Sequence, residues 1–173
     1  MVFASSSSVY GNNKKVPFAE TDDVDSPISP YAFTKRACEM QNHVFHKLFG
    51  ISFINLRFFT VYGERQRPDL AIHKFTEKIL NGDVIQVYGD GSTFRDYTHV
   101  SDIVDGIRLA VARILDSGQA LFETFNLGNS SPVGLMELIR LIETKSGRKA
   151  NLEHLPMQPG DVDRTYASLE KST

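Results

Sequence analysis

The stretch Ser29-Pro30-Tyr31-Ala32-Phe33-Thr34-Lys35 decides much about the fold of this chain. Ser29 is a residue type that caps helix N-termini, and Pro30 suits the first helical position because its missing N–H group would have no partner there. The stretch therefore predicts a helix that begins at Pro30. In that helix Tyr31 and Lys35 lie four residues apart and share one face.

A tyrosine and a lysine one helical turn apart can act together in proton transfer. A phenol has an ordinary pKa of about 10, and a nearby ammonium group favours the phenolate, which makes the tyrosine a better base. Ser6, in the run Ser5-Ser6-Ser7-Ser8-Val9-Tyr10-Gly11, is the candidate to orient a substrate hydroxyl beside them. The same spacing also occurs in helices with one aromatic face and a solvated lysine, so other motifs must decide.

Hydrophobic periodicity predicts alternating strands and helices along the chain. The helix over residues 30–49 carries a stripe of apolar residues, which we expect to be buried against a sheet. These positions are Phe33, Ala37, Met40, Val44, Phe45, Leu48 and Phe49. Further strands are expected near residues 1–5, 51–59, 84–88, 122–127 and 151–155, and further helices near 69–80, 101–115 and 133–144.

Several motifs occur together with the tyrosine and the lysine. They are Phe3-Ala4-Ser5-Ser6-Ser7-Ser8-Val9-Tyr10-Gly11, Leu56-Arg57-Phe58-Phe59-Thr60-Val61-Tyr62-Gly63, Arg67-Pro68-Asp69-Leu70-Ala71, Arg95-Asp96-Tyr97-Thr98-His99-Val100, Phe125-Asn126-Leu127-Gly128 and Pro159-Gly160-Asp161-Val162. In this order they resemble the extended short-chain dehydrogenase/reductase family. The similarity is greatest to NAD-dependent nucleotide-sugar epimerases that act at C4 of UDP-glucuronate or UDP-glucose.

The resemblance implies a mechanism of transient oxidation at C4. It implies that Tyr31 takes the proton from the sugar 4-hydroxyl, that Ser6 orients this hydroxyl, and that Lys35 favours the phenolate. NAD would accept the hydride and return it to the other face of the rotated 4-keto sugar. For the cofactor, the resemblance implies that Tyr31 and Lys35 lie at the nicotinamide ribose, with Phe58 beside the nicotinamide.

The resemblance also implies a UDP-sugar site. Thr60 is expected at the substrate phosphates or sugar, and Arg95 at the diphosphate, where arginine donates charge-assisted hydrogen bonds. Arg67 could bind a uronate carboxylate bidentately, which favours UDP-glucuronate over UDP-glucose, although a solvated loop arginine is an equal alternative. The remaining candidates are Tyr88 at the uracil ring and Gln158 and Asp161 near the ribose or phosphates.

Two related reactions are disfavoured. By resemblance, sugar 4,6-dehydratases and UDP-glucuronate decarboxylases carry acidic residues just before Val-Tyr-Gly, where this chain has Ser7 and Ser8. A hydroxyl does not replace a carboxyl acid, so epimerisation is favoured.

The expected fold class is α/β, with the C-terminal part of a Rossmann-type parallel sheet and a smaller α/β substrate-binding region. Residues 1–63 are assigned to the NAD-binding domain and 64–173 mainly to the substrate region. The glycine-rich dinucleotide fingerprint appears nowhere in the sequence, so the chain is expected to be an N-terminally truncated family member. A non-catalytic nucleotide-sugar binding fragment is therefore a second hypothesis.

Composition excludes several classes of binding partner and site. A formal net charge of −2 over 173 residues argues against a nucleic-acid or membrane-surface binder. Cys38 is the single cysteine, which excludes an internal disulfide and favours a cytoplasmic location. The acidic loop at 20–25 and the pair His43 and His46 lack the spacing of metal ligands, so no metal is expected. The resemblance suggests a homodimer through the helix that carries Tyr31.

Overall fold

The computed structural model describes residues 1–156 and 164–172. Helix α1 (Pro30–Phe49) begins as expected, because the Ser29 side chain accepts a hydrogen bond from the N–H group of Ala32 at 3.1 Å. The helix ends at Gly50, whose φ of 64° is in the left-handed region that glycine adopts without steric cost. The start and the end predicted from the sequence are therefore confirmed.

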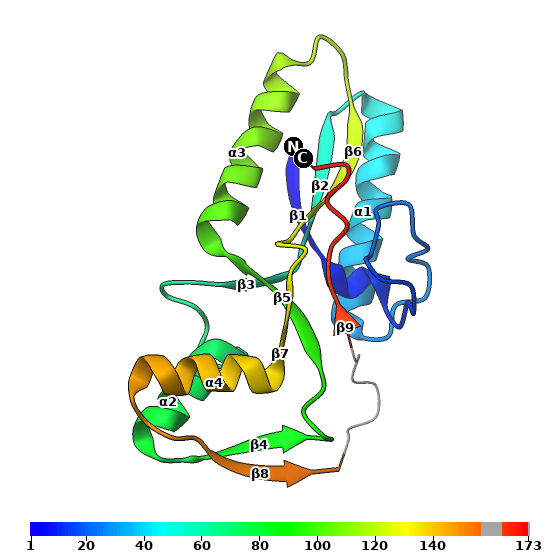
Figure 1. Ribbon diagram of the computed structural model, residues 1–173. Helices are drawn as coiled ribbons and strands as arrows, with labels where there is room; N and C mark the ends of the chain where they lie inside the picture. Colours follow the sequence, from blue (N-terminus) through cyan, green and yellow to red (C-terminus); the bar gives the residue numbers. More distant parts are fainter. Residues whose placement is uncertain (157–163, 173) are drawn as a thin grey trace.

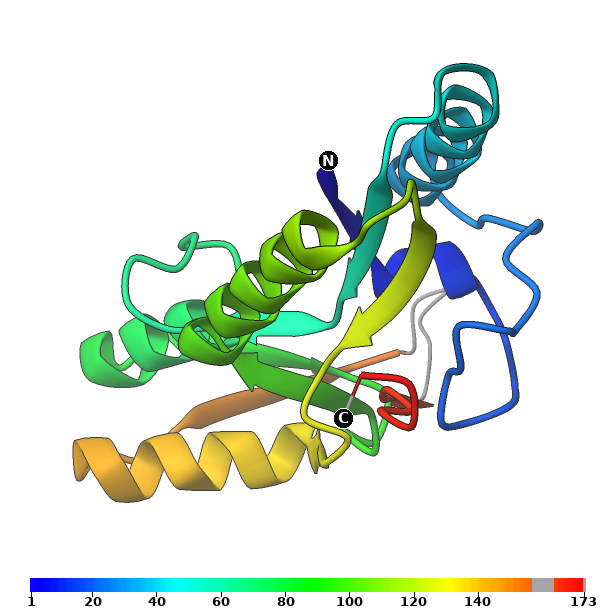
Figure 2. The same ribbon diagram turned by 90° about the horizontal axis from the view of Figure 1, so that it is seen from above.

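A three-stranded parallel sheet forms the upper layer in Figure 1. Its strands are in the order β1 (Val2–Ser6), β2 (Phe53–Phe58) and β6 (Phe122–Leu127). Helix α1 covers one face of this sheet and helix α3 (Val100–Asp116) covers the other, as Figure 2 shows from above. All described strands of this sheet are parallel, so their carboxyl ends meet at one edge.

The two faces of the upper sheet differ in chemistry. Side chains alternate along β2, so that Ile54 and Leu56 point toward α3 and pack with Ala110. Asn55 and Arg57 point the other way, toward α1, and are also buried. We call these the α3 face and the α1 face.

The apolar stripe of α1 does not pack against the sheet. The buried residues of this helix are Ala32, Glu39 and Asn42, two of which are polar. The expectation of an apolar contact was wrong, because it assumed an apolar sheet face, whereas the α1 face is polar. The exposed members of the expected stripe are Phe33, Met40, Val44, Phe45, Leu48 and Phe49.

A second sheet lies below the first. Strand β5 (Phe94–His99) pairs in parallel with β3 (Thr60–Tyr62) and β9 (Arg164–Thr165), and antiparallel with β7 (Pro132–Gly134). The strand β5 was not predicted, because Arg95 and Asp96 interrupt the alternation of apolar residues.

The lowest layer contains a separate parallel pair, β4 (Val84–Tyr88) and β8 (Asn151–Leu155). Helices α2 (Ala71–Asn81) and α4 (Leu135–Ser146) pack together above this pair (Figure 1). Their shared apolar core consists of Ile79, Ile85, Val87, Leu138, Ile139 and Ile142.

The observed alternation of strands and helices confirms an α/β fold with parallel sheets. Helix and strand boundaries differ from the expected ones by a few residues, and β4, β6 and β8 match them. Strand β6 and helix α3 come from the second half of the chain but complete the upper layer (Figure 1). Among the described residues, no helix is both long and apolar enough to cross a membrane.

Candidate active site

The candidate catalytic residues lie where the strands of the upper sheet end. Ser6 is the last residue of β1 and is aligned in register with Phe58, the last residue of β2. Helix α1 begins at this edge with Tyr31 in its first turn, and it contacts the short 3-10 helix η1 (Ser7–Tyr10) that follows Ser6. Ligands in open α/β folds bind at such carboxyl edges, and this edge is therefore the candidate active site.

Lys35 links the helix to the strand beside Ser6. Its Nζ donates a hydrogen bond to the backbone oxygen of Ala4 at 2.8 Å and lies 5.6 Å from the centroid of the Tyr31 ring. The ammonium group is therefore within cation–π distance of the Tyr31 ring. Tyr31 itself is 55% exposed, which leaves its ring accessible to a ligand.

Ser6 is held by its own loop. Its Oγ accepts a hydrogen bond from the N–H group of Ser8 at 3.2 Å and donates one to Ser8 Oγ at 3.1 Å. Ser6 thereby caps η1, and its hydroxyl is fixed in direction. Within the described residues, the hydroxyl groups of Ser6 and Tyr31 make no hydrogen bond with each other.

Phe58 is the last residue of β2, and Thr60, two positions later, is the first residue of β3. Phe58 packs on the α3 face against the cluster of Ile54 and Leu56. Thr60 lies opposite Tyr97 in the parallel ladder between β3 and β5. Because side chains alternate along a strand, Thr60, Tyr97 and Arg95 point to the same face of this sheet.

Arg95 and Tyr88 are placed on different layers. Arg95 is on β5 and donates a hydrogen bond from Nη1 to the backbone oxygen of Phe94 at 2.9 Å. Tyr88 is half-buried at the end of β4, opposite Leu155. Gln158 and Asp161, which follow Leu155 in the sequence, lie outside the described residues.

Arg67 lies in the loop after β3, and its side chain is 74% exposed. It forms a two-point ion pair with Asp69, with 3.0 Å between Nε and Oδ1. The pKa of Arg67 is raised, chiefly by the hydrogen bond with Asp69 and by the negative charge of that residue. Arg67 therefore already binds a carboxylate with the two-point geometry that a uronate would require.

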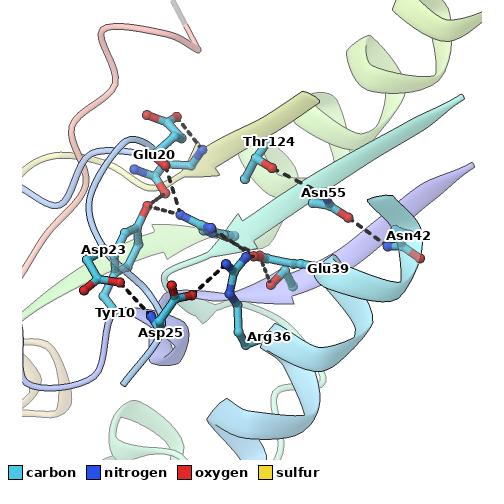
Figure 3. Close-up of polar contacts among 12 residues, drawn as sticks. Tyr10, Glu20, Asp23, Asp25, Arg36, Glu39, Asn42, Asn55 and Thr124 are labelled. Atoms are coloured by element: carbon cyan, nitrogen blue, oxygen red, sulfur yellow. Dashed lines mark hydrogen bonds and ion pairs between the residues drawn. The ribbon is translucent and has the colours of Figure 1, made fainter. Parts of the chain in front are cut away.

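Sequence reasoning missed a buried ion pair behind this edge. Glu39 of α1 and Arg57 of β2 are 2% and 3% exposed. The guanidinium donates from Nε to Oε1 at 3.0 Å and from Nη2 to Oε2 at 2.9 Å. Ser5 Oγ donates a third hydrogen bond to Oε1 at 2.6 Å. Figure 3 shows Glu39 reaching from the helix toward the strands.

The network continues from Arg57 to the serine loop. Arg57 Nη1 donates to the hydroxyl of Tyr10 at 3.0 Å, and this hydroxyl donates to Oδ1 of Asn126 at 2.7 Å. The backbone N–H group of Asn126 in turn donates a hydrogen bond to Oε1 of Glu20 at 2.7 Å. The contacts of Tyr10 and Glu20 can be followed in Figure 3. One network therefore joins the helix, all three strands and the loop that follows Ser6.

The ionisation of this network has clear causes. Burial would raise the pKa of Glu39, but the hydrogen bonds and charge of Arg57, with the hydrogen bond of Ser5, outweigh it and lower the pKa. The pKa of Arg57 is raised, because Glu39 and Tyr10 outweigh the effect of burial. Burial prevails at Tyr10, whose pKa is raised despite the nearby charge of Arg57. The pair is therefore ionised at neutral pH, with Tyr10 protonated.

Two sequence signals could have revealed this network. Glu39 follows Lys35 by one helical turn and therefore lies on the same face as Tyr31 and Lys35. Arg57 is the one charged residue in a strand that is apolar apart from Asn55, and a charge in a buried strand requires a partner. Neither signal identifies the partner, because the pairing depends on how α1 lies on the sheet.

The edge fits part of a nicotinamide cofactor site. A lysine ammonium and an accessible phenol beside parallel strand ends suit the hydroxyl groups of a ribose. Among the described residues, no cluster of three or more His, Cys, Asp or Glu side chains is placed to hold a metal ion.

Comparisons with known proteins agree with this geometry. The model of the NAD dependent epimerase/dehydratase family matches residues 1–128. An uncharacterized protein of Methanocaldococcus jannaschii, MJ1055, is 56% identical over 99% of this chain and 51% of its own length. The chain thus spans about half the length of the curated relatives it matches.

Solved structures of nucleotide-sugar epimerases also match this chain over about half of their own length. The UDP-glucuronic acid 4-epimerase of Bacillus cereus in complex with UDP-glucuronic acid and NAD has a TM-score of 0.88 and 34% identity. The match covers 99% of this chain and 53% of that one. The UDP-glucose 4-epimerase of Thermotoga maritima with UDP-glucose has a TM-score of 0.87 and 32% identity, covering 99% of this chain and 55% of that one.

Proposed function

Because this chain belongs to the NAD-dependent epimerase/dehydratase family, we propose that the protein acts as a UDP-glucuronate 4-epimerase, with UDP-glucose or UDP-galactose as the alternative substrate. The observation that carries the proposal is the placement of Lys35 between the Ala4 carbonyl and the Tyr31 ring, at the strand edge where Ser6 ends β1. This placement gives a proton acceptor, a cation that stabilises it and an orienting hydroxyl in one region.

In the proposed mechanism, Tyr31 as phenolate takes the proton from the sugar 4-hydroxyl while the C4–H bond breaks. Ser6 orients that hydroxyl, and Lys35 stabilises the phenolate and binds the nicotinamide ribose. The chemistry that NAD supplies when bound is reversible hydride acceptance. With that chemistry supplied, Tyr31 would return its proton to the 4-oxygen of the sugar, so that the overall reaction would involve no net oxidation.

We propose Phe58 as the nicotinamide neighbour, and Thr60, Tyr88 and Arg95 as substrate-binding residues. The side chains of Thr60 and Arg95 lie on the same face of the second sheet, and this supports a diphosphate-binding site formed by these two residues. Gln158 and Asp161 complete the proposed set, although they lie outside the described residues.

We propose that Arg67 binds the carboxylate group of the substrate. Its support is the two-point contact with Asp69, which a substrate carboxylate could replace. Arginine binds carboxylates with fixed bidentate geometry, and this favours a uronate over a neutral hexose.

The proposed division places the NAD-binding part in residues 1–63 and mainly the substrate-binding part in 64–173. A homodimer through α1 is part of the proposal, and the exposed apolar residues of that helix support it. They include Phe33, Met40, Val44, Phe45, Leu48 and Phe49.

The test is product analysis of the purified protein with UDP-glucuronate and NAD. We expect UDP-galacturonate with no release of carbon dioxide, and loss of turnover in Tyr31→Phe by a factor of about 100 to 10,000. Carbon dioxide or a 4-keto-6-deoxy sugar would instead support the decarboxylase or dehydratase alternative. Binding of a UDP-sugar without turnover would support a non-catalytic module.

A further inference from the structure

Two consecutive residues of β1 are tied to α1 just before the strand reaches Ser6. The Ala4 oxygen accepts a hydrogen bond from Lys35 at 2.8 Å, and the Ser5 hydroxyl donates one to Glu39 at 2.6 Å. Lys35 and Glu39 are successive positions on one helix face, one turn apart. The strand end and the helix start are therefore joined at two points directly behind the candidate catalytic edge.

We propose that Glu39 is a positioning residue, which fixes the end of β1, and with it Ser6, relative to Tyr31 and Lys35. The inference rests on the proposed function for the roles of the three catalytic candidates. It goes beyond that function because Glu39 is buried and, within the described part of the chain, makes no hydrogen bond to Tyr31 or Ser6.

The geometry around Glu39 suits a fixed support. Both carboxylate oxygens are bound by Arg57 in a two-point contact, and one of them also accepts the Ser5 hydroxyl. Charge-assisted hydrogen bonds are short and directional, so they fix the position of α1 relative to the strands. An apolar contact would allow the helix to slide along the sheet. A displacement of about 1 Å at a catalytic group can lower a rate about 100-fold. Holding α1 in a fixed position on the strands would therefore preserve the rate.

The network divides into two limbs at Arg57. The first limb runs through Glu39 to Ser5 and controls the strand end. The second limb runs through the Tyr10 hydroxyl to Asn126 and links the far end of η1 to β6. The first limb acts on the position of Ser6, whereas the second limb satisfies buried polar groups and contributes to stability.

Ser5→Ala is the direct test, since it removes the first limb's contact with the strand but leaves the ion pair intact. We expect kcat to fall about tenfold, with KM for UDP-glucuronate changed less than about twofold, because substrate contacts remain while catalytic alignment is lost. Amide hydrogen exchange of residues 6–11 should become faster. Ser5→Thr, which restores a hydroxyl, should recover most of kcat.

The matched control is Ser117→Ala, which removes a hydroxyl hydrogen bond of the same length, 2.6 Å, to the backbone oxygen of Gln119. This serine follows α3 and lies away from the edge, so kcat and exchange at residues 6–11 should not change. Tyr10→Phe cuts the second limb and should lower the stability of the fold more than it lowers kcat.

The outcomes separate the two proposals. Unchanged kcat and unchanged exchange in Ser5→Ala would overturn the positioning role of Glu39. A larger loss of kcat in Tyr10→Phe than in Ser5→Ala would also overturn it. If the unmodified protein does not epimerise UDP-sugars, the proposed function fails, and hydrogen exchange still decides whether Glu39 fixes the strand end.

Discussion

The α3 face and the α1 face of the upper sheet are built from the same strands but differ in chemistry. On the α3 face, Ile54 and Leu56 pack against Ala110 without polar contacts between them. On the α1 face, Asn55 binds Asn42 at 2.8 Å, and Arg57 binds Glu39. The apolar face can only exclude water, whereas the polar face also specifies how one helix lies on the strands.

The polar face is costly to build. Removing two charges from water is unfavourable, and a buried ion pair often stabilises a fold no more than apolar residues of the same volume would. The helix on the α1 face carries Tyr31 and Lys35, and Glu39 of the same helix binds Ser5, the residue before Ser6. This difference indicates that the ion pair serves the geometry of the edge more than the stability of the fold.

The largest expected effect comes from breaking the ion pair on one side only. Glu39→Gln leaves Arg57 as a buried cation without a counter-charge, and it should lower the free energy of unfolding by about 3–5 kcal/mol. Urea unfolding followed by circular dichroism would measure it. A loss below about 1 kcal/mol would mean that Arg57 finds water or another partner in the variant.

A matched change on the α3 face should have a somewhat smaller effect. Leu56 is 1% exposed, but it borders a pocket of about 380 Å³ between α3 and the sheet that is open to solvent, so water can fill part of the space left by a smaller side chain. Leu56→Ala should therefore cost about 2–3 kcal/mol, in the lower part of the range for such truncations. Its kcat should stay near that of the unmodified protein, and a fall as large as that of Ser5→Ala would remove the contrast between the faces.

Tyr10→Phe should have a smaller effect on stability again. It removes one hydroxyl that bridges Arg57 and Asn126, leaving a donor and an acceptor without that partner. The expected loss is about 1–3 kcal/mol in the same unfolding experiment. No measurable loss would show that the second limb of the network is not needed for stability.

Acid should weaken the α1 face before it affects the α3 face. The pKa of Glu39 is lowered in the folded state from its ordinary value of 4.5. Its contribution to stability is therefore complete above that value and is lost as the pH falls through the folded-state pKa, by up to about 1.4 kcal/mol for each unit of lowering. The difference in unfolding free energy between the unmodified protein and Glu39→Gln should shrink below pH 4.5, and a difference independent of pH would contradict this.

The sequence predicted the parts of the fold that local signals define. The cap at Ser29, the stop at Gly50 and the strands at 84–88, 122–127 and 151–155 follow from residue type and periodicity alone. The orientation of α1 could not be obtained in this way, because its apolar stripe is exposed and a polar stripe faces the sheet. Hydrophobic periodicity identifies an amphipathic helix but not the chemistry of the surface that it meets.

The candidate site was predictable only in part. The spacing of Tyr31 and Lys35 placed them on one helix face, and the structure confirms their proximity. The pairing of Glu39 with Arg57 joins residues 18 positions apart across two elements, and nothing in either local sequence specifies it. Residue type showed that Arg57 needed a partner, and tertiary structure was required to find it.

The most direct test replaces both members of the ion pair by apolar residues of similar volume, as in the double variant Glu39→Met with Arg57→Leu. If the α1 face serves the geometry of the edge, the variant should unfold within about 2 kcal/mol of the unmodified protein and lose about 100-fold in kcat with UDP-glucuronate. A variant that is equally stable and keeps its full kcat would contradict the account, because apolar packing would then position Ser6, Tyr31 and Lys35 as well as the ion pair does.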